Sequence, residues 1–226
     1  MLGKAFFGMW FLVFSVIGIY LSISSAIIED IQTMQQSTPA LIAFYYFDFK
    51  DVSKRSVRGL LASILFQLAW DSGHCWDVLY RLYTACRNGS EQPSDAALSD
   101  CLKSMLELPG QVPIFVVVDA LDECPNDTGT PSPREKVLDL VKDLVGSNHR
   151  NLFMCITSRP EQDIQTTLNP LTSPSCRVSI HEEAGQKEDI NKYVRDFVDT
   201  DESIRRWRAE DRELVINTLS DRAGGM

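Results

Sequence analysis

Three acidic residues follow an apolar run near the middle of the chain. Residues 114–118 read Ile-Phe-Val-Val-Val, Asp119 ends the run, and Asp122 and Glu123 lie in the next turn. A mostly β-branched run of this length is typical of a buried strand in a parallel sheet. Mg²⁺–nucleotide chemistry uses such a strand end, with one carboxylate at the metal and another orienting the attacking water. The pattern therefore predicts Asp119 as a metal ligand and Asp122 and Glu123 as catalytic candidates, with Glu123 preferred.

Each acid also has a purely structural interpretation. Asp119 could cap the turn that follows its strand, because apolar runs that end in aspartate are common. Asp122 and Glu123 could form a solvated acidic turn, since two adjacent acids cannot both face one nucleotide. The sequence leaves these alternatives open.

A second, mostly apolar run at 152–157 ends in Thr157 and is followed by Ser158 and Arg159. We predict that Arg159 binds the cofactor and senses a γ-phosphate, because a guanidinium recognises phosphate oxygens in a fork geometry. The alternative is a surface ion pair with Asp122 or Glu123, which would hold the two strand ends together. Thr157 and Ser158 are interpreted as residues that form the turn and not as catalysts.

The elements that must position these residues alternate between short apolar runs and amphipathic stretches. This alternation predicts an α/β fold with a mostly parallel sheet. Strands are expected at 41–49, 113–119, 152–157 and 177–180. Helices are expected at 24–34, 53–70, 76–86, 94–108, 134–145, 161–168, 185–198 and 210–222.

Four stretches of the chain, in order, resemble the NACHT domains of large fungal proteins with ankyrin or WD repeats. They are residues 43–49 (second strand), 55–68 (the helix after it), 116–124 (Walker B) and 155–160 (sensor 1). The resemblance spans residues 22–226. It implies a P-loop NTPase of the STAND class, a three-layer sandwich that binds Mg-ATP or Mg-GTP. It also implies a cytoplasmic signalling switch that associates with itself or with other signalling proteins.

The chain departs from this family at the phosphate-binding loop. No Gly-x-x-x-x-Gly-Lys-Ser/Thr pattern occurs, and Gly3-Lys4 lacks both the upstream glycine and the following hydroxyl. Without that loop the β- and γ-phosphates lose their main binding partners. We therefore expect a partial NACHT-type signalling and oligomerisation domain that is deficient in ATP or GTP binding and hydrolysis. The alternative is a catalytically dead interaction or scaffold module.

The N-terminal segment, residues 1–23, is expected to be distinct from the partial domain at 24–226. Residues 5–23 are apolar and uncharged. They suit a membrane helix, which would tether the chain, or a signal peptide that starts at Lys4. They also suit a core strand, because residues 11–19 contain β-branched side chains that could replace the missing first strand. The join at Ser24, where the family pattern resumes, favours an artefact of gene prediction as the origin of the segment.

The formal net charge of −9 argues against nucleic acid as a partner, because phosphate contacts need clustered cations. The six cysteines are scattered and form no Cys-x-x-Cys pair, which is typical of a reducing compartment and not of a zinc site. The family pattern continues beyond both ends, so the chain is expected to be a fragment.

Overall fold

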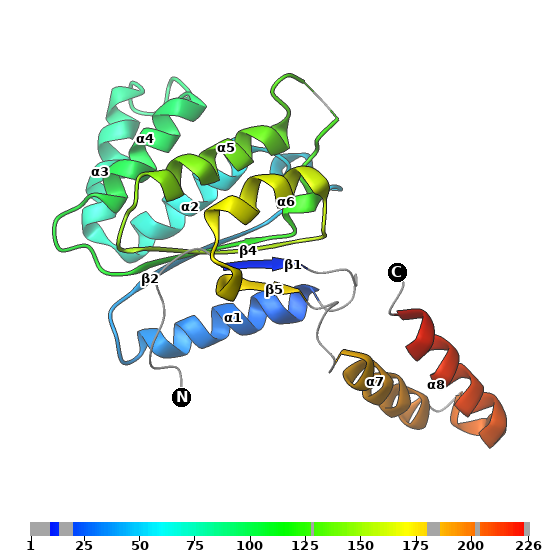
Figure 1. Cartoon of the computed structure of the whole chain (residues 1–226). Coiled ribbons are helices and arrows are strands. Elements are labelled where there is room, and N and C mark those ends of the chain that lie inside the picture. The colour runs from blue at the N-terminus through cyan, green and yellow to red at the C-terminus, as the bar shows by residue number, and fades with distance from the viewer. Residues whose placement is uncertain (1–9, 14–19, 128, 180–185, 202–203, 224–226) are drawn as a thin grey trace. The chain divides into compact units, whose positions relative to one another are not determined.

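The centre of the fold is a five-stranded sheet in the order β2-β3-β4-β1-β5 (Figure 1). This computed structural model describes residues 10–13, 20–127, 129–179, 186–201 and 204–223. Strands β2, β3, β4 and β1 run parallel to one another. The strands are β1 (Trp10–Val13), β2 (Leu41–Tyr46), β3 (Ile114–Asp119), β4 (Leu152–Ser158) and β5 (Arg177–Ser179).

Strand β1 comes from the apolar N-terminal segment. Trp10 lies opposite Cys155 and Val13 opposite Ser158, so β1 pairs with β4 and lies between β4 and β5. The expectation that this segment replaces the missing first strand is therefore confirmed for β1. Residues 1–9 and 14–19 lie outside the described residues. No helix in the described part of the chain is long and apolar enough to cross a bilayer.

Helices cover both faces of the sheet (Figure 1). On one face α1 contributes Ile28, which packs with Ile42 and Val117. On the other face Ala43 and Val116 belong to the larger core, because successive side chains of a strand point to opposite faces. The predicted fold, a P-loop NTPase-like three-layer sandwich with a mostly parallel sheet, is confirmed.

The helices of this sandwich begin and end close to the predicted bounds. The apolar side chains of α2 are buried in the larger core, as expected for an amphipathic helix with one core-facing side. The helices are α1 (Tyr20–Gln35), α2 (Val57–Asp71), α3 (Gly73–Ala85), α4 (Asp95–Leu106), α5 (Pro133–Gly146) and α6 (Gln162–Leu168). Short 3₁₀ turns lie at Val52–Lys54, Leu121–Glu123, Asn169–Leu171 and Pro174–Cys176.

The described residues from Ser179 onward belong to a second compact unit. It contains α7 (Gln186–Thr200), a 3₁₀ turn (Ile204–Arg206) and α8 (Ala209–Ala223). The two helices pack together, with an ion pair between Arg195 and Glu213 at 3.0 Å. Both predicted C-terminal helices are thus confirmed.

Candidate functional site

The carboxyl ends of the parallel strands meet at one edge of the sheet. Tyr46 at the end of β2 lies opposite Asp119 at the end of β3, and Val13 at the end of β1 lies opposite Ser158 at the end of β4. In open α/β sheets, ligands bind in the crevice outside this edge. All four predicted site residues lie at these strand ends or in the first turn beyond them.

Asp119 is buried, with 4% of its surface exposed, and it binds two hydroxyl groups. Its Oδ1 accepts hydrogen bonds from the hydroxyl of Ser24 in α1 and from the hydroxyl of Thr157 in β4, the latter at 2.6 Å. Burial raises the pKa of Asp119 above its ordinary value, the two hydroxyl groups lower it, and the charge of Asp122 raises it. The carboxylate therefore ties α1, β3 and β4 together at the edge.

Thr157 has a role that the sequence interpretation missed. Thr157 and Ser158 are fully buried residues of β4, so their assignment as turn residues is wrong. Besides donating to Asp119, the Thr157 hydroxyl accepts a hydrogen bond from the Ala120 N–H at 3.0 Å. Ala120 has a φ of 53°, a left-handed conformation that a residue with a Cβ rarely adopts. Thr157 thus satisfies the amide of a strained turn and fixes the direction in which the acidic turn leaves β3.

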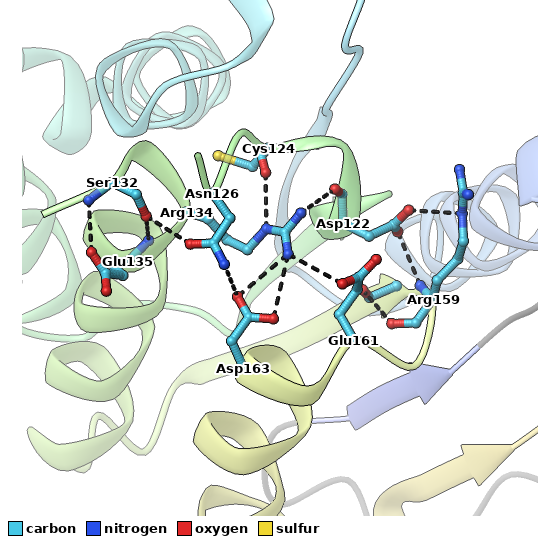
Figure 2. Close-up of polar contacts among 10 residues, drawn as sticks. Asp122, Cys124, Asn126, Ser132, Arg134, Glu135, Arg159, Glu161 and Asp163 are labelled. Atoms are coloured by element: carbon cyan, nitrogen blue, oxygen red, sulfur yellow. Dashed lines mark hydrogen bonds and ion pairs between the residues drawn. The ribbon is translucent and has the colours of Figure 1, made fainter. Parts of the chain in front are cut away.

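Asp122 and Arg159 form an ion pair across the ends of β3 and β4 (Figure 2). Arg159 Nε lies 2.9 Å from Asp122 Oδ2, and the Arg159 backbone N–H donates to Asp122 Oδ1 at 2.9 Å. The Asp122 side chain is 4% exposed and that of Arg159 is 44% exposed. The predicted ion pair is confirmed, and it engages both carboxylate oxygens of Asp122. The catalytic role of Asp122 and the phosphate-sensing role of Arg159 stay predictions.

Glu123 has a different partner. Its Oε2 accepts a hydrogen bond from the Phe49 N–H at 3.1 Å, which joins the acidic turn to the segment after β2. Burial raises the pKa of Glu123, and the hydrogen bond from Phe49 partly opposes that shift. Asp119, Asp122 and Glu123 are therefore bound to separate groups at this edge, and the catalytic role of Glu123 stays a prediction.

Arg134 is a buried cation beside this edge that sequence reasoning did not identify (Figure 2). Its side chain, in the first turn of α5, is 8% exposed. Its Nε donates to the Cys124 carbonyl at 2.9 Å and its Nη2 to the Asp122 carbonyl at 2.6 Å. Its Nη1 lies 3.3 Å from Asp163 Oδ2 and 3.7 Å from Glu161 Oε2. Arg134 therefore fastens the acidic turn to the start of α6.

The loop before Arg134 is held by its own hydrogen bonds (Figure 2). Ser132 and Glu135 form a capping box at the start of α5. The Ser132 hydroxyl also donates to Asn126 at 2.9 Å, and Asn126 donates to Asp163 at 3.0 Å. A cation in the first turn of a helix opposes the helix dipole. Ser132-Pro133 marks a helix start in the sequence, and Arg134 follows it directly. An arginine at this position was therefore a sign that acidic side chains lie close to it in the fold.

The resemblance to P-loop NTPases raises the question of whether these residues fit a Mg²⁺–nucleotide site. A hydroxyl and a carboxylate such as those of Ser24 and Asp119 hold Mg²⁺ in P-loop NTPases, where phosphate and water complete the shell. Among the described residues, no group of three or more His, Cys, Asp or Glu could hold a metal. Residues 14–19, which join β1 to α1, read Phe-Ser-Val-Ile-Gly-Ile and contain no lysine. The types of Ser24 and Asp119 fit such a metal, whereas the sequence between β1 and α1 does not fit the phosphates.

The comparisons with known proteins bear on this geometry. No curated protein matches the chain. A family described as Nephrocystin 3, N-terminal, matches residues 22–159, which is more than half of the chain. The match starts within α1 and ends at Arg159, so it contains Asp119, Asp122, Glu123, Arg134 and Arg159 but not Glu161 and Asp163. It is not a match to NACHT domains, so that resemblance stays a prediction. The chain belongs to the nephrocystin 3, N-terminal family.

Proposed function

We propose that this chain is a NACHT-type signalling domain that has lost nucleotide binding and works through association with itself or with other signalling proteins. One observation carries the proposal: Asp119 is held in place at the strand edge by Ser24 and Thr157, while the sequence that joins β1 to α1 has no phosphate-binding loop. In open α/β sheets ligands bind at this edge, and the sequence offers no phosphate-binding loop that would hold the phosphates of a nucleotide there.

The chemistry of magnesium explains why the acids alone do not rescue binding. Mg²⁺ is rarely caged by protein ligands only; it is bound by one or two carboxylates together with substrate phosphates. The lysine and the backbone N–H groups of a phosphate-binding loop are what hold those phosphates. Asp119 and Ser24 on their own therefore support neither tight Mg²⁺ binding nor tight nucleotide binding.

The other polar groups at the edge support an interaction role. Asp122 is paired with Arg159, and Glu123 is bound to the Phe49 amide, so each acid has a structural partner without a ligand. These bonds hold the strand ends in one conformation, and a surface with one conformation can bind a partner protein without first being ordered. The second candidate is a catalytically dead interaction or scaffold module, with residues 5–23 as its membrane tether. Four residues of that segment, Trp10–Val13, form a strand of the sheet, which argues against the tether.

Isothermal titration calorimetry of the full chain with Mg-ATP and with Mg-GTP tests the proposal. We expect a dissociation constant weaker than about 1 mM for both, since the phosphate contacts are missing. Binding in the micromolar range would overturn the proposal. ATP hydrolysis is expected at the level of a protein-free control.

A graft tests whether the rest of the site is intact. Replacing residues 14–21 by Gly-x-x-x-x-Gly-Lys-Ser keeps the chain length and puts a phosphate-binding loop between β1 and α1. We expect the graft to bind Mg-ATP at least tenfold more tightly than the natural chain. The matched control, the same graft with Asp119→Asn, should lose the Mg²⁺-dependent part of that gain. A folded graft that gains nothing would contradict the assignment of Asp119 as the metal ligand.

A further inference from the structure

Helices α2 and α3 expose a group of aromatic side chains that does not belong to the site described above. We define the aromatic face as Phe66 and Trp70 of α2 and Trp76, Tyr80 and Tyr83 of α3, which are 57%, 76%, 50%, 53% and 48% exposed. The Phe66 and Trp70 rings lie 5.9 Å apart, and those of Tyr80 and Tyr83 lie 6.1 Å apart. The spacing of four and then three residues in α3 puts its three aromatic side chains on one side of the helix.

The aromatic face borders an apolar cavity of about 500 Å³. Phe66, Trp76, Tyr80 and Tyr83 line it together with the loop that contains Gly89. A Cβ on Gly89 would lie 2.7 Å from Tyr83 Cε2, so the Tyr83 ring lies directly against the loop backbone. The loop backbone at Gly89 and the Tyr83 ring therefore form one side of the cavity.

The size of the aromatic face matches that of an interface. Five aromatic side chains of roughly 200 Å² each, about half exposed, present about 500 Å² of apolar surface. A stable interface needs roughly 800 Å² on each partner, and single apolar patches of a few hundred Å² often mark interaction sites. The aromatic face supplies more than half of that area before its rim is counted.

The charges beside the aromatic face identify the partner. Asp77 and Arg81 are exposed on the adjacent flank of α3, one helical turn apart, and neither has an ion-pair partner among the described residues. In an antiparallel pair of α3 helices related by a two-fold axis, Asp77 faces Arg81 of the second copy, and Trp76 meets the Tyr83 side of that copy. A parallel pair would instead place like charges together. Helix α3 is thus complementary to itself in one orientation.

We propose that the aromatic face is a homodimer interface, in which α3 packs antiparallel against α3 of a second copy of this chain. The inference rests on the proposed function in one respect, since it names the partner for the self-association proposed above. The dimer proposal does not depend on whether nucleotide binds. The calorimetric test can therefore overturn the proposed function while the dimer stands, and the dimer test can fail while the proposed function stands.

Sedimentation velocity of the full chain between about 1 and 200 µM tests the dimer, a range suited to a weak or standard-size interface. We expect a reversible monomer–dimer equilibrium. Tyr80→Glu should weaken it at least tenfold, because each substitution acts twice in a symmetric interface. The control Val52→Gln changes a side chain that is 77% exposed outside the aromatic face and should leave the equilibrium unchanged. Circular dichroism checks that each variant is folded.

Charge reversal tests the orientation. Asp77→Arg and Arg81→Asp should each weaken self-association, because each places like charges across the axis. A mixture of the two single variants should form a heterodimer, and the double variant should regain the natural affinity. A chain that is monomeric at 200 µM, a dimer unaffected by Tyr80→Glu, or single variants that do not bind each other would overturn the proposal. A monomeric result would leave the cavity to a different protein partner.

Discussion

Arg134→Met removes a buried cation and keeps most of the side-chain volume. In the natural chain the guanidinium donates to the Cys124 and Asp122 carbonyls and lies beside Asp163 and Glu161 (Figure 2). Methionine fills the same space but donates nothing. The substitution therefore isolates the polar contribution of Arg134 from that of its packing.

The loss in free energy of unfolding depends on which partners of Arg134 water can reach once the guanidinium is removed. The two carbonyls lose charge-assisted hydrogen bonds in a buried position, worth about 1.5 kcal/mol each at the lower end of the usual range. Asp163 and Glu161 are 31% and 49% exposed, so they rehydrate, and their ion pairs add less than about 1 kcal/mol. We expect Arg134→Met to lower the free energy of unfolding by about 3–4 kcal/mol.

A matched control comes from the same compact unit. Arg58 donates to the Pro93 carbonyl at 2.6 Å and pairs with Asp95 at 3.2 Å, but both charged side chains are more than 40% exposed. Arg58→Met should cost about 1 kcal/mol, because exposed pairs contribute little.

Urea denaturation at pH 7, followed by far-UV circular dichroism, measures both variants. An unchanged m-value would show that the substitutions alter stability and not the extent of unfolding. If Arg134→Met costs no more than Arg58→Met, the reasoning that burial makes the Arg134 contacts strong is refuted.

Two further predictions concern single positions. Asp119→Asn should leave the melting temperature at pH 7 unchanged or higher, because burial raises the pKa of Asp119 and its ionised form carries that cost. The stability that the natural carboxyl contributes is present below about pH 4 and is lost as the pH rises through its raised pKa. The variant should therefore be less favoured over the natural chain at pH 4 than at pH 7. If Asp119→Asn lowers the free energy of unfolding by more than about 2 kcal/mol at pH 7, this reasoning is contradicted. Gly59→Ala should lower the free energy of unfolding by about 1–3 kcal/mol in urea despite alanine's better helix propensity, because its Cβ would lie 2.5 Å from the Ser53 carbonyl and 2.6 Å from Tyr45 Oη; a stabilised variant would contradict it.

Much of the fold could be predicted because it depends on patterns that are local in sequence. The runs that became β3 and β4 and the apolar stripe of α2 need only side-chain periodicity to be read. The N-terminal strand was harder. Its residues suit a membrane helix, a signal peptide or a strand, and only pairing with a distant segment selects Trp10–Val13 and its register against β4.

The candidate site was predictable in position but not in its internal partners. Asp119 and Arg159 were found because each lies at or just beyond the end of an apolar run. Thr157 and Arg134 were missed because their partners are far away in sequence or are backbone carbonyls, which have no signature in the chain. The left-handed conformation of Ala120 has no signal either, since alanine does not favour it.

Three acids lie at the strand edge although the sequence has no phosphate-binding loop, and their hydrogen bonds and ion pair explain why they are stable there. Buried polar groups must find partners, and a group that loses its ligand has to be satisfied by protein or water. Asp119 is satisfied by two hydroxyl groups, Asp122 by Arg159, and Glu123 by a backbone amide. Each bond joins two different elements at the strand ends. These acids therefore contribute to the shape of the edge whether or not a nucleotide binds, and their presence alone is no measure of NTPase activity.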